Sequence, residues 1–439
     1  MIKKIQQDFS YYSHEFKDNY RKGVHRLRTI LASRAQAQAF VSNAGGTAVV
    51  LGYEPSAPDK NAQELYALLA ASPYINDAVQ TFLGSIYEAG AESQDAMYSD
   101  SARCLEILHD PVMARAAGAG AVSAGKWIAT LAGQSCNLYR DMNAVAASDI
   151  AMTAVAASET AMEAVISGNI ALNAVAASKT AMTAVAANET AMAAVAASRV
   201  AMSAIIGNST ALNAVVTSSV AMAAVIGNST ALNAVVSSQT AMAAIASSST
   251  AMAAVTESYV AVAAVYGSAV AVEAVKANET AWSTLTGASS AVMGKAAAKL
   301  AGLNPADYAD MAAVASSSTA MTAIANNKTA ITAVEASAVA KNALYNSPLK
   351  TSISNIASTS SWTTRRNGKI WLISFRQTWS SGNTSMQHRS TLKDGGTVSC
   401  TASQSYNTDY RIDRFMDSIT NYNSAGGIGN VCTYYFIPC

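Results

Sequence analysis

The chain has 439 residues, a length that usually corresponds to several domains. Charged residues make up only 13% of it, about half of the usual share, and apolar residues make up 51%. Aromatic residues supply only 7%, so the apolar fraction is mostly alanine. The net charge of +1 excludes a strongly basic nucleic-acid-binding protein and an acidic solvating tail.

Residues 1–140 are predicted to form a mainly helical attachment domain. Within residues 1–34, aromatic and aliphatic residues recur three or four positions apart, which predicts an amphipathic helix. We expect this helix to pack on its own domain or on its trimer mates, with a membrane-surface or docking helix as the alternative. Further helices are expected over residues 62–71, 75–88 and 101–108. The small residues at 116–125 predict close helix packing or a flexible joint.

A ten-residue repeat dominates the middle of the chain, and thirteen complete decads run from Ala151 to Thr280. The first and fourth positions are always Ala, the fifth is Val or Ile, and the second is Met, Leu or Val. Ser, Asn or Gly gathers near the seventh and eighth positions. The predicted shaft spans residues 141–344, with an irregular joint near residues 286–310.

The decad suits neither a continuous helix nor a strand. Ten residues of α-helix turn about 1000°, roughly 80° short of three full turns, so a stripe with this period slides around a straight helix. Strict alternation fails as well, because the conserved apolar positions fall on both parities. We therefore expect one short helical segment per decad, reset by the Ser/Asn/Gly-x-Thr turn, with identical units stacked along an axis.

One decad is too small to bury its own apolar residues, so its Met and Val must meet neighbouring repeats or neighbouring chains. The invariant alanines permit close approach of backbones. We expect an elongated homotrimeric rod, with other small oligomers as alternatives.

Residues 345–439 are predicted to form a small β-rich tip. Short β-branched and aromatic runs at residues 370–375, 397–401 and 430–437 lie between turn clusters. Nine Lys and Arg residues against four Asp and Glu make this segment mildly basic. Aromatic residues with a polar group suit sugar stacking or protein interfaces. The candidate receptor-binding residues are Trp362, Trp371, Trp379, Tyr406, Tyr410 and Tyr422, and Tyr434 and Tyr435 belong to the same aromatic set.

Signals for catalysis, metals and cofactors are weak. His109-Asp110 is interpreted as a helix-end contact, and Asp409, Asp413 and Asp417 as charges on a solvated helix, with glycan cleavage as the alternative. We expect no enzyme activity, metal or cofactor. The Asn-x-Thr sequences of the repeats, such as Asn188-Glu-Thr, are explained by turn chemistry without a glycan.

Cysteine and membrane signals are also weak. The five cysteines (Cys104, Cys136, Cys400, Cys432 and Cys439) have no zinc-ligand spacing, and the last three leave open either a disulfide or buried free thiols. The 57 residues from Val200 to Thr256 are uncharged, but polar residues interrupt every apolar run, so we expect no membrane insertion. No secretion signal is expected from the N-terminal residues.

The tandem Ala-Met-x-Ala-Val-x-x-Ser-x-Thr decads of residues 142–340 resemble the shafts of tail fibre proteins of tailed bacteriophages. The resemblance implies a homotrimeric virion protein, made in the host cytoplasm. Its N-terminus would dock on the tail or baseplate proteins, and its C-terminal tip would bind a bacterial surface glycan or outer-membrane protein. The alternatives are a bacterial surface adhesin, a glycan-degrading tailspike and an ice-binding rod.

Overall fold

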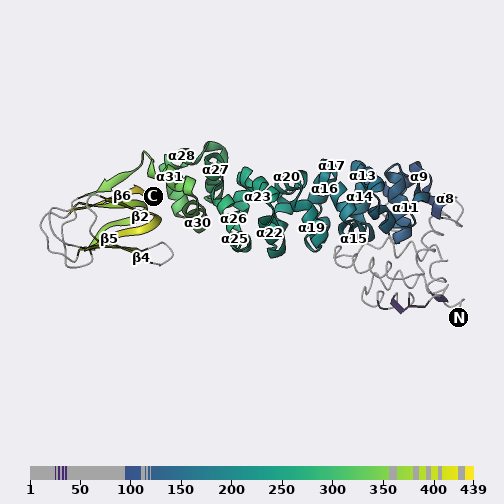
Figure 1. Ribbon diagram of the computed structural model, residues 1–439. Coiled ribbons are helices and arrows are strands. Elements are labelled where there is room, and N and C mark those ends of the chain that lie inside the picture. The colour runs from purple at the N-terminus through teal and green to yellow at the C-terminus, as the bar shows by residue number, and fades with distance from the viewer. Residues whose placement is uncertain are drawn as a thin grey trace. The chain divides into compact units, whose positions relative to one another are not determined.

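The computed structural model describes residues 94–109, 120–354, 363–378, 385–391, 397–403, 408–423 and 431–439, with isolated residues at 25–36 and at 114, 117 and 118. Side chains at 363, 377–410 and 421–432 are not described. The helices predicted over 1–34, 62–71 and 75–88 therefore lie outside the described residues, apart from a few isolated positions. The described chain is mostly helical, with one antiparallel sheet near its C-terminus (Figure 1).

Packing divides the chain into two compact units, Met1–Ala234 and Val235–Cys439. The boundary falls inside the predicted shaft. The described helices of the first unit are α8 (Gln94–Tyr98), α9 (Ser101–His109), α11 (Ala121–Leu131), η1 (Cys136–Leu138), α12 (Met142–Ala147), α13 (Asp149–Ala157), α14 (Glu159–Ser167), α15 (Asn169–Ala177), α16 (Lys179–Ala187), α17 (Glu189–Ala197), α18 (Arg199–Ile206), α19 (Ser209–Val216) and α20 (Ser219–Gly227); α21 (Ser229–Val236) spans the boundary. The helix predicted over 101–108 is confirmed as α9.

The second unit continues the repeat and ends in the sheet. Its helices are α22 (Gln239–Ala246), α23 (Ser249–Glu257), α24 (Tyr259–Gly267), α25 (Ala269–Lys276), α26 (Glu279–Thr286), α27 (Ser290–Leu300), η2 (Pro305–Asp307), α28 (Met311–Ala315), α29 (Ser318–Ala325), α30 (Lys328–Ala336) and α31 (Ala338–Tyr345).

Each decad forms one short helix, as the sequence predicts. The helix ends because the eighth residue of the decad adopts an extended conformation, for example Ser158 with φ −105° and ψ 114°. That residue ends one helix and begins the next. Where this residue is Ser or Asn, its side-chain oxygen accepts a hydrogen bond from the backbone N–H three residues later, as Ser158 Oγ does from Ala161 N at 3.2 Å. An N-cap of this kind stabilises a helix by about 1 kcal/mol. Five neighbouring helix pairs are bent by 94–100° at these residues.

The bends let many of the helices pack on the third helix further along the same chain. In the first unit α13 contacts α16 and α17 contacts α20, and in the second unit α22 contacts α25. The first, second and fifth residues of every decad are buried in this stack, Met152 and Val155 completely. A single chain therefore buries the Met and Val side chains against its own neighbouring repeats, which is the first of the two expected alternatives.

The N-cap serine also ties successive turns of the stack together. Ser178 Oγ donates to the carbonyl of Ala146, and Ser218 Oγ to the carbonyl of Ala186. In the second unit Ser268 Oγ donates to Val236 O at 2.6 Å. Each of these pairs spans 32 residues. One hydroxyl therefore caps its own helix and satisfies a carbonyl at a helix end one turn away, where the four last carbonyls of a helix otherwise lack partners.

The predicted joint near 286–310 is a second copy of the segment that begins the first array. Gly125-Lys126 and Gly294-Lys295 lie in α11 and α27 of identical length, and each helix is followed by Leu-Ala-Gly, a short 3₁₀ helix and Tyr-x-Asp-Met. In both copies the Gly after the helix has a positive φ, 72° at Gly133 and 77° at Gly302. We call these two segments, 121–146 and 290–315, the initiation motifs. The second lies within the helical part of its unit, where α27 contacts both α24 and α30.

A close backbone crossing defines each initiation motif. A Cβ added at Gly125 would overlap the backbone of Asp141 and Met142, and one at Gly294 would overlap Asp310 and Met311. The small-residue stretch at 116–125 is thus explained, at its end, by close helix packing. Each crossing places an aspartate at the N-cap of the first repeat helix, α12 or α28.

The six-stranded antiparallel sheet has the strand order β1-β6-β2-β5-β3-β4. Its strands are β1 (Thr351–Ile353), β2 (Thr363–Thr378), β3 (Ser385–Thr391), β4 (Thr397–Ser403), β5 (Thr408–Asn423) and β6 (Val431–Pro438). The strands predicted at 370–375, 397–401 and 430–437 are confirmed as parts of β2, β4 and β6. One face holds a core of Ile370, Leu372, Phe375, Met416, Ile419, Tyr434 and Phe436. Trp371 and Ile373 are also buried and alternate with this core, so they lie on the opposite face.

Candidate functional site

The predicted receptor-binding aromatics divide into three groups. Trp362, Trp379 and Tyr406 lie outside the described residues. Tyr410 and Tyr422 lie in β5, opposite Phe375 of β2 and Gln387 of β3 respectively, and only their backbone is described. The side chains of these five residues therefore lie outside the described part of the chain, and their role in binding stays a prediction.

Trp371 is a core residue, contrary to its place among the receptor-binding candidates. Its side chain is fully buried, and its ring meets Phe415 edge-on with 4.9 Å between the ring centroids. The indole N–H is buried and has no hydrogen-bond partner among the residues that the structure describes. Tyr434 is likewise buried and packs against Phe375. These rings stabilise the sheet and do not reach solvent.

The sheet is attached to the last repeat helices by a carboxylate. Glu335 of α30 accepts a hydrogen bond from Phe415 N at 2.9 Å and forms an ion pair with Arg414 at 2.8 Å. Glu335 occupies the sixth position of its repeat. The preceding repeat has Ala325 at this position. Its side chain is only 15% exposed. The substitution of an acid for an alanine thus marks where the repeat meets the sheet.

Beside this attachment, tyrosine and cationic side chains alternate. Lys350 Nζ lies 4.3 Å from the ring centroid of Tyr345 and 5.5 Å from that of Tyr435. The guanidinium of Arg411 lies 4.7 Å from the Tyr345 ring. Arg411 also donates to Asn342 Oδ1 and to the carbonyl of Lys341, both at 3.4 Å. We call Lys341, Tyr345, Lys350, Arg411 and Tyr435 the tyrosine–cation cluster.

Sequence reasoning noted the basic charge of this segment and included Tyr435 in the aromatic set, but missed the cluster. Tyr345 ends α31, Lys350 precedes β1, Arg411 lies in β5 and Tyr435 lies in β6. The signal that was present is the excess of Lys and Arg over Asp and Glu after residue 345. Spacing alone does not show that these four segments converge.

Asp409, Asp413 and Asp417 lie in strand β5 and not on a helix, so the predicted helix was wrong. The register of β2 and β5 shifts between Leu372 and Ser374, where Ile412 and Asp413 form a bulge. Asp413 has a positive φ of 51°, which Asp tolerates better than most residues. It is buried, its Oδ2 pairs with Arg411 Nε at 2.9 Å, and burial raises its pKa above the ordinary value. This arrangement fixes the bulge, and the side chain of Asp409 lies outside the described residues.

The cysteines and asparagines of the described part have structural explanations. Cys104, Cys136 and Cys439 are free thiols, and burial raises the pKa of Cys104 and of Cys439 to about 12. The Cys400 and Cys432 side chains lie outside the description. The asparagines of all five Asn-x-Thr sequences cap helices through Oδ1, at Asn188, Asn208, Asn228, Asn278 and Asn327.

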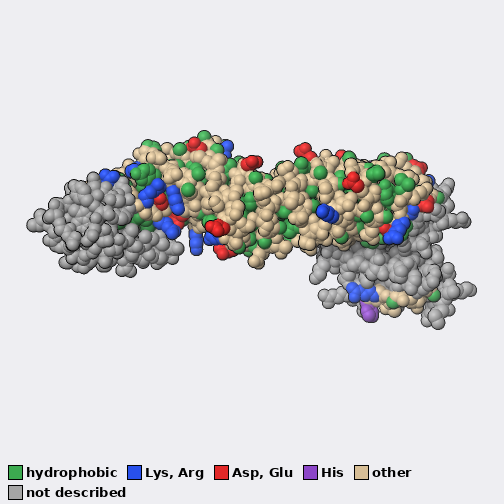
Figure 2. Space-filling model, in the orientation of Figure 1, with side chains coloured by type: hydrophobic (Ala, Val, Ile, Leu, Met, Phe, Trp, Pro, Cys, Tyr) green, Lys and Arg blue, Asp and Glu red, His purple; other side chains and the backbone are tan. Residues whose placement is uncertain are grey.

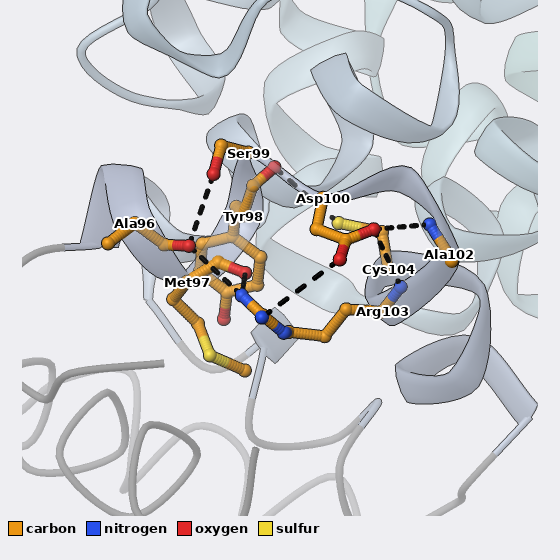
Figure 3. A network of polar contacts seen from close by, with 8 residues as sticks. All are labelled: Ala96, Met97, Tyr98, Ser99, Asp100, Ala102, Arg103 and Cys104. Carbon is orange, nitrogen blue, oxygen red and sulfur yellow. Dashed lines mark hydrogen bonds and ion pairs between the residues drawn. The ribbon is translucent and has the colours of Figure 1, made fainter. Parts of the chain in front are cut away.

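The segment between α8 and α9 is held by a polar network around Arg103 and Cys104 (Figure 3). Arg103 Nη1 donates to the carbonyls of Ala96 and Met97, and Asp100 Oδ1 accepts from Ala102 N at 2.9 Å. Cys104 Sγ contacts the Tyr98 carbonyl at 3.6 Å. His109 is the last residue of α9, consistent with its predicted place at a helix end. The network is a structural turn that packs on α11, the first initiation motif.

Comparisons with known proteins supply no family for this chain. No family model matches it, and no curated protein matches it. Among the described residues no group of His, Cys, Asp or Glu is arranged to hold a metal ion. No single described helix is long and apolar enough to cross a membrane. Five bent helix pairs reach the necessary length and apolar composition when the two helices are taken together.

Proposed function

We propose that this protein is a bacteriophage tail fibre that docks on the tail or baseplate by its N-terminal region and binds the host surface by its C-terminal sheet. The observation that carries the proposal is the architecture of the second unit, in which a regular helical stack ends with α31 and is followed by a sheet of different composition. In this proposal the helical stack is the shaft and the sheet is the tip.

The outward side chains of the repeats suit a shaft. The third and seventh positions of the decads are mostly exposed, and many hold Ala, Ser, Thr, Asn or Gly, such as Ala193 and Gly227. Figure 2 shows a stretch of the helical part with few charged side chains on the face in view. A surface of small, mostly uncharged side chains offers little for specific binding, whereas the two ends of the chain have a different composition.

The proposed assembly is a homotrimer, as in the fibres that the repeats resemble. Because one chain buries its own Met and Val residues, chains would have to meet through the exposed face of the shaft or through the terminal regions. A trimer of this kind would keep its helical content when it dissociates on dilution. Sedimentation at several concentrations, with circular dichroism at each, measures both properties.

Electron microscopy of the purified full chain tests the fibre proposal directly. An elongated particle with a terminal knob supports it, and a compact particle refutes it. The chain should also bind whole bacteria of its host and compete with phage adsorption. Release of oligosaccharide from capsule or lipopolysaccharide during this incubation would instead identify a glycan-degrading spike.

A further inference from the structure

The tyrosine–cation cluster has more positive charge than its neighbourhood neutralises. Lys341, Lys350 and Arg411 supply three positive charges. Asp413 pairs with Arg411 and is itself buried, so its single charge balances one of them. Arg376 also lies over the ring of Tyr435 at 5.9 Å, and because it makes a further interaction its charge is not counted in the excess. The cluster therefore presents an excess of about two positive charges.

The cluster is fixed in place and still reaches solvent. Arg411 is 41% exposed, while Tyr345, Lys350 and Tyr435 are half-buried. Lys350 Nζ donates to the Tyr345 carbonyl at 3.3 Å in addition to its contacts with the two rings. Figure 2 shows Lys and Arg side chains gathered where the helices end, next to the sheet. Cations held by rings and carbonyls lose less conformational freedom when an anion binds than cations on free side chains do.

The chemistry of the cluster fits a carboxylate on a sugar. Ammonium and guanidinium groups form short, charge-assisted hydrogen bonds to carboxylates, and tyrosine hydroxyls bond to neutral sugar hydroxyls. A repetitive acidic polymer compensates for the modest affinity of a single small site, because several fibres can engage one polysaccharide at once. A nucleic acid is a poor fit, since the whole chain carries a net charge of only +1.

We infer that the tyrosine–cation cluster binds carboxylate groups of an acidic polysaccharide at the bacterial surface. This inference rests on the proposed function, because it names the class of receptor that the tip region would recognise. Lys350 and Arg411 contact the anion in this assignment, and Tyr345 and Tyr435 hold the cations and bond to neighbouring hydroxyls.

Binding of the full chain to polygalacturonate, a polymer of uronic acid, tests the inference, with neutral dextran and poly-L-glutamate as comparison polymers. We expect salt-sensitive binding to polygalacturonate, and weaker binding to both of the others. The double variant Lys350→Gln/Arg411→Gln should bind at least about tenfold more weakly, since two charge-assisted contacts are lost. The control Lys179→Gln/Lys328→Gln removes two exposed charges from the repeats and should bind within about twofold of the wild type.

A further variant separates binding from folding. Lys341→Gln leaves both ring contacts of Lys350 and the backbone carbonyl that Arg411 uses, so it should fold as the wild type and still weaken binding measurably. Thermal unfolding of each variant reports its folding. Undiminished binding of folded double and Lys341→Gln variants would overturn the inference, and equally tight binding to poly-L-glutamate would overturn the assignment to a sugar.

The same variants distinguish this inference from the proposed function. If the wild type binds host bacteria and the double variant binds them equally well, the cluster is not the receptor site and the fibre proposal stands. If the wild type binds polygalacturonate through the cluster but neither binds bacteria nor forms a fibre, the site stands and the fibre proposal fails.

Discussion

The two initiation motifs make a quantitative prediction at their glycines. In Gly294→Ala the new methyl group would meet the backbone of Asp310 and Met311, which cannot rotate away as a side chain would. Overpacking costs about 1–3 kcal/mol, and a contact with backbone belongs at the upper end. Replacing a helical glycine by alanine returns about 1 kcal/mol of helix propensity. The net loss should therefore be about 2 kcal/mol, and Gly125→Ala should lose a similar amount.

Matched controls lie in the same two units. Gly227 and Gly267 each end a repeat helix, and an added Cβ meets no atom within 4 Å at either position. Alanine there should be neutral or stabilise by up to about 1 kcal/mol. Urea unfolding followed by far-UV circular dichroism measures all four variants, with Gly125 compared with Gly227 and Gly294 with Gly267. If Gly294→Ala is as stable as Gly267→Ala, the close crossing of α27 and α28 is wrong.

Three further predictions concern the cap, the attachment of the sheet and a thiol. Ser218→Ala should destabilise the chain by about 2 kcal/mol in urea unfolding, because the Ala221 N–H loses its cap and the Ala186 carbonyl loses its donor. Ser218→Asn keeps the cap and should therefore recover about half of the lost stability. Glu335→Gln keeps an acceptor for Phe415 N but removes the charge opposite the half-exposed Arg414. We expect the free energy of unfolding to fall by about 1 kcal/mol and proteolysis within the sheet to be faster. Unchanged stability and proteolysis would show that the ion pair is unimportant. Cys104, with a pKa raised from 9.0 to about 12, should react with Ellman's reagent at pH 8 only as the chain unfolds. Because the unfolded Cys104 thiol ionises first, its contribution to stability is present below pH 9 and is lost between pH 9 and 12, so a Cys104→Ala variant should lose less stability over this range than the wild type.

Local structure was predictable where the signal is local. A serine or asparagine at the eighth position of a decad, followed by helix-forming Ala and Met, predicts both the N-cap and the helix, and Ser158 shows both. The way the helices stack was not predictable in the same way. It depends on a bend of nearly 100° at one extended residue, and propensities do not give that angle.

The second initiation motif could have been found from the sequence. Gly-Lys, Leu-Ala-Gly and Tyr-x-Asp-Met recur in the same order and spacing 169 residues apart, at Gly125 and again at Gly294. Within the ten-residue periodicity this segment looks like a degraded repeat, because its similarity is to a segment 169 residues earlier and not to the neighbouring decads.

The candidate site was predictable only as a region. An aromatic residue in a short sheet serves equally as core or as binding surface, and composition does not separate the two, as the complete burial of Trp371 shows. The spacing of four between Asp409, Asp413 and Asp417 predicts one face of a helix. The same sequence spacing occurs here on strand β5, where Asp413 lies in a bulge. The cluster around Lys350 depends on contacts between the end of α31 and the sheet, which no local pattern reports.

The single extended residue in each decad also bears on how such a gene changes over time. Since each helix packs on the third one after it, loss or gain of three whole decads would bring equivalent faces together again. Recombination between nearly identical coding segments produces such changes readily. The number of repeats can then vary between descendants while the two ends of the chain are inherited unaltered.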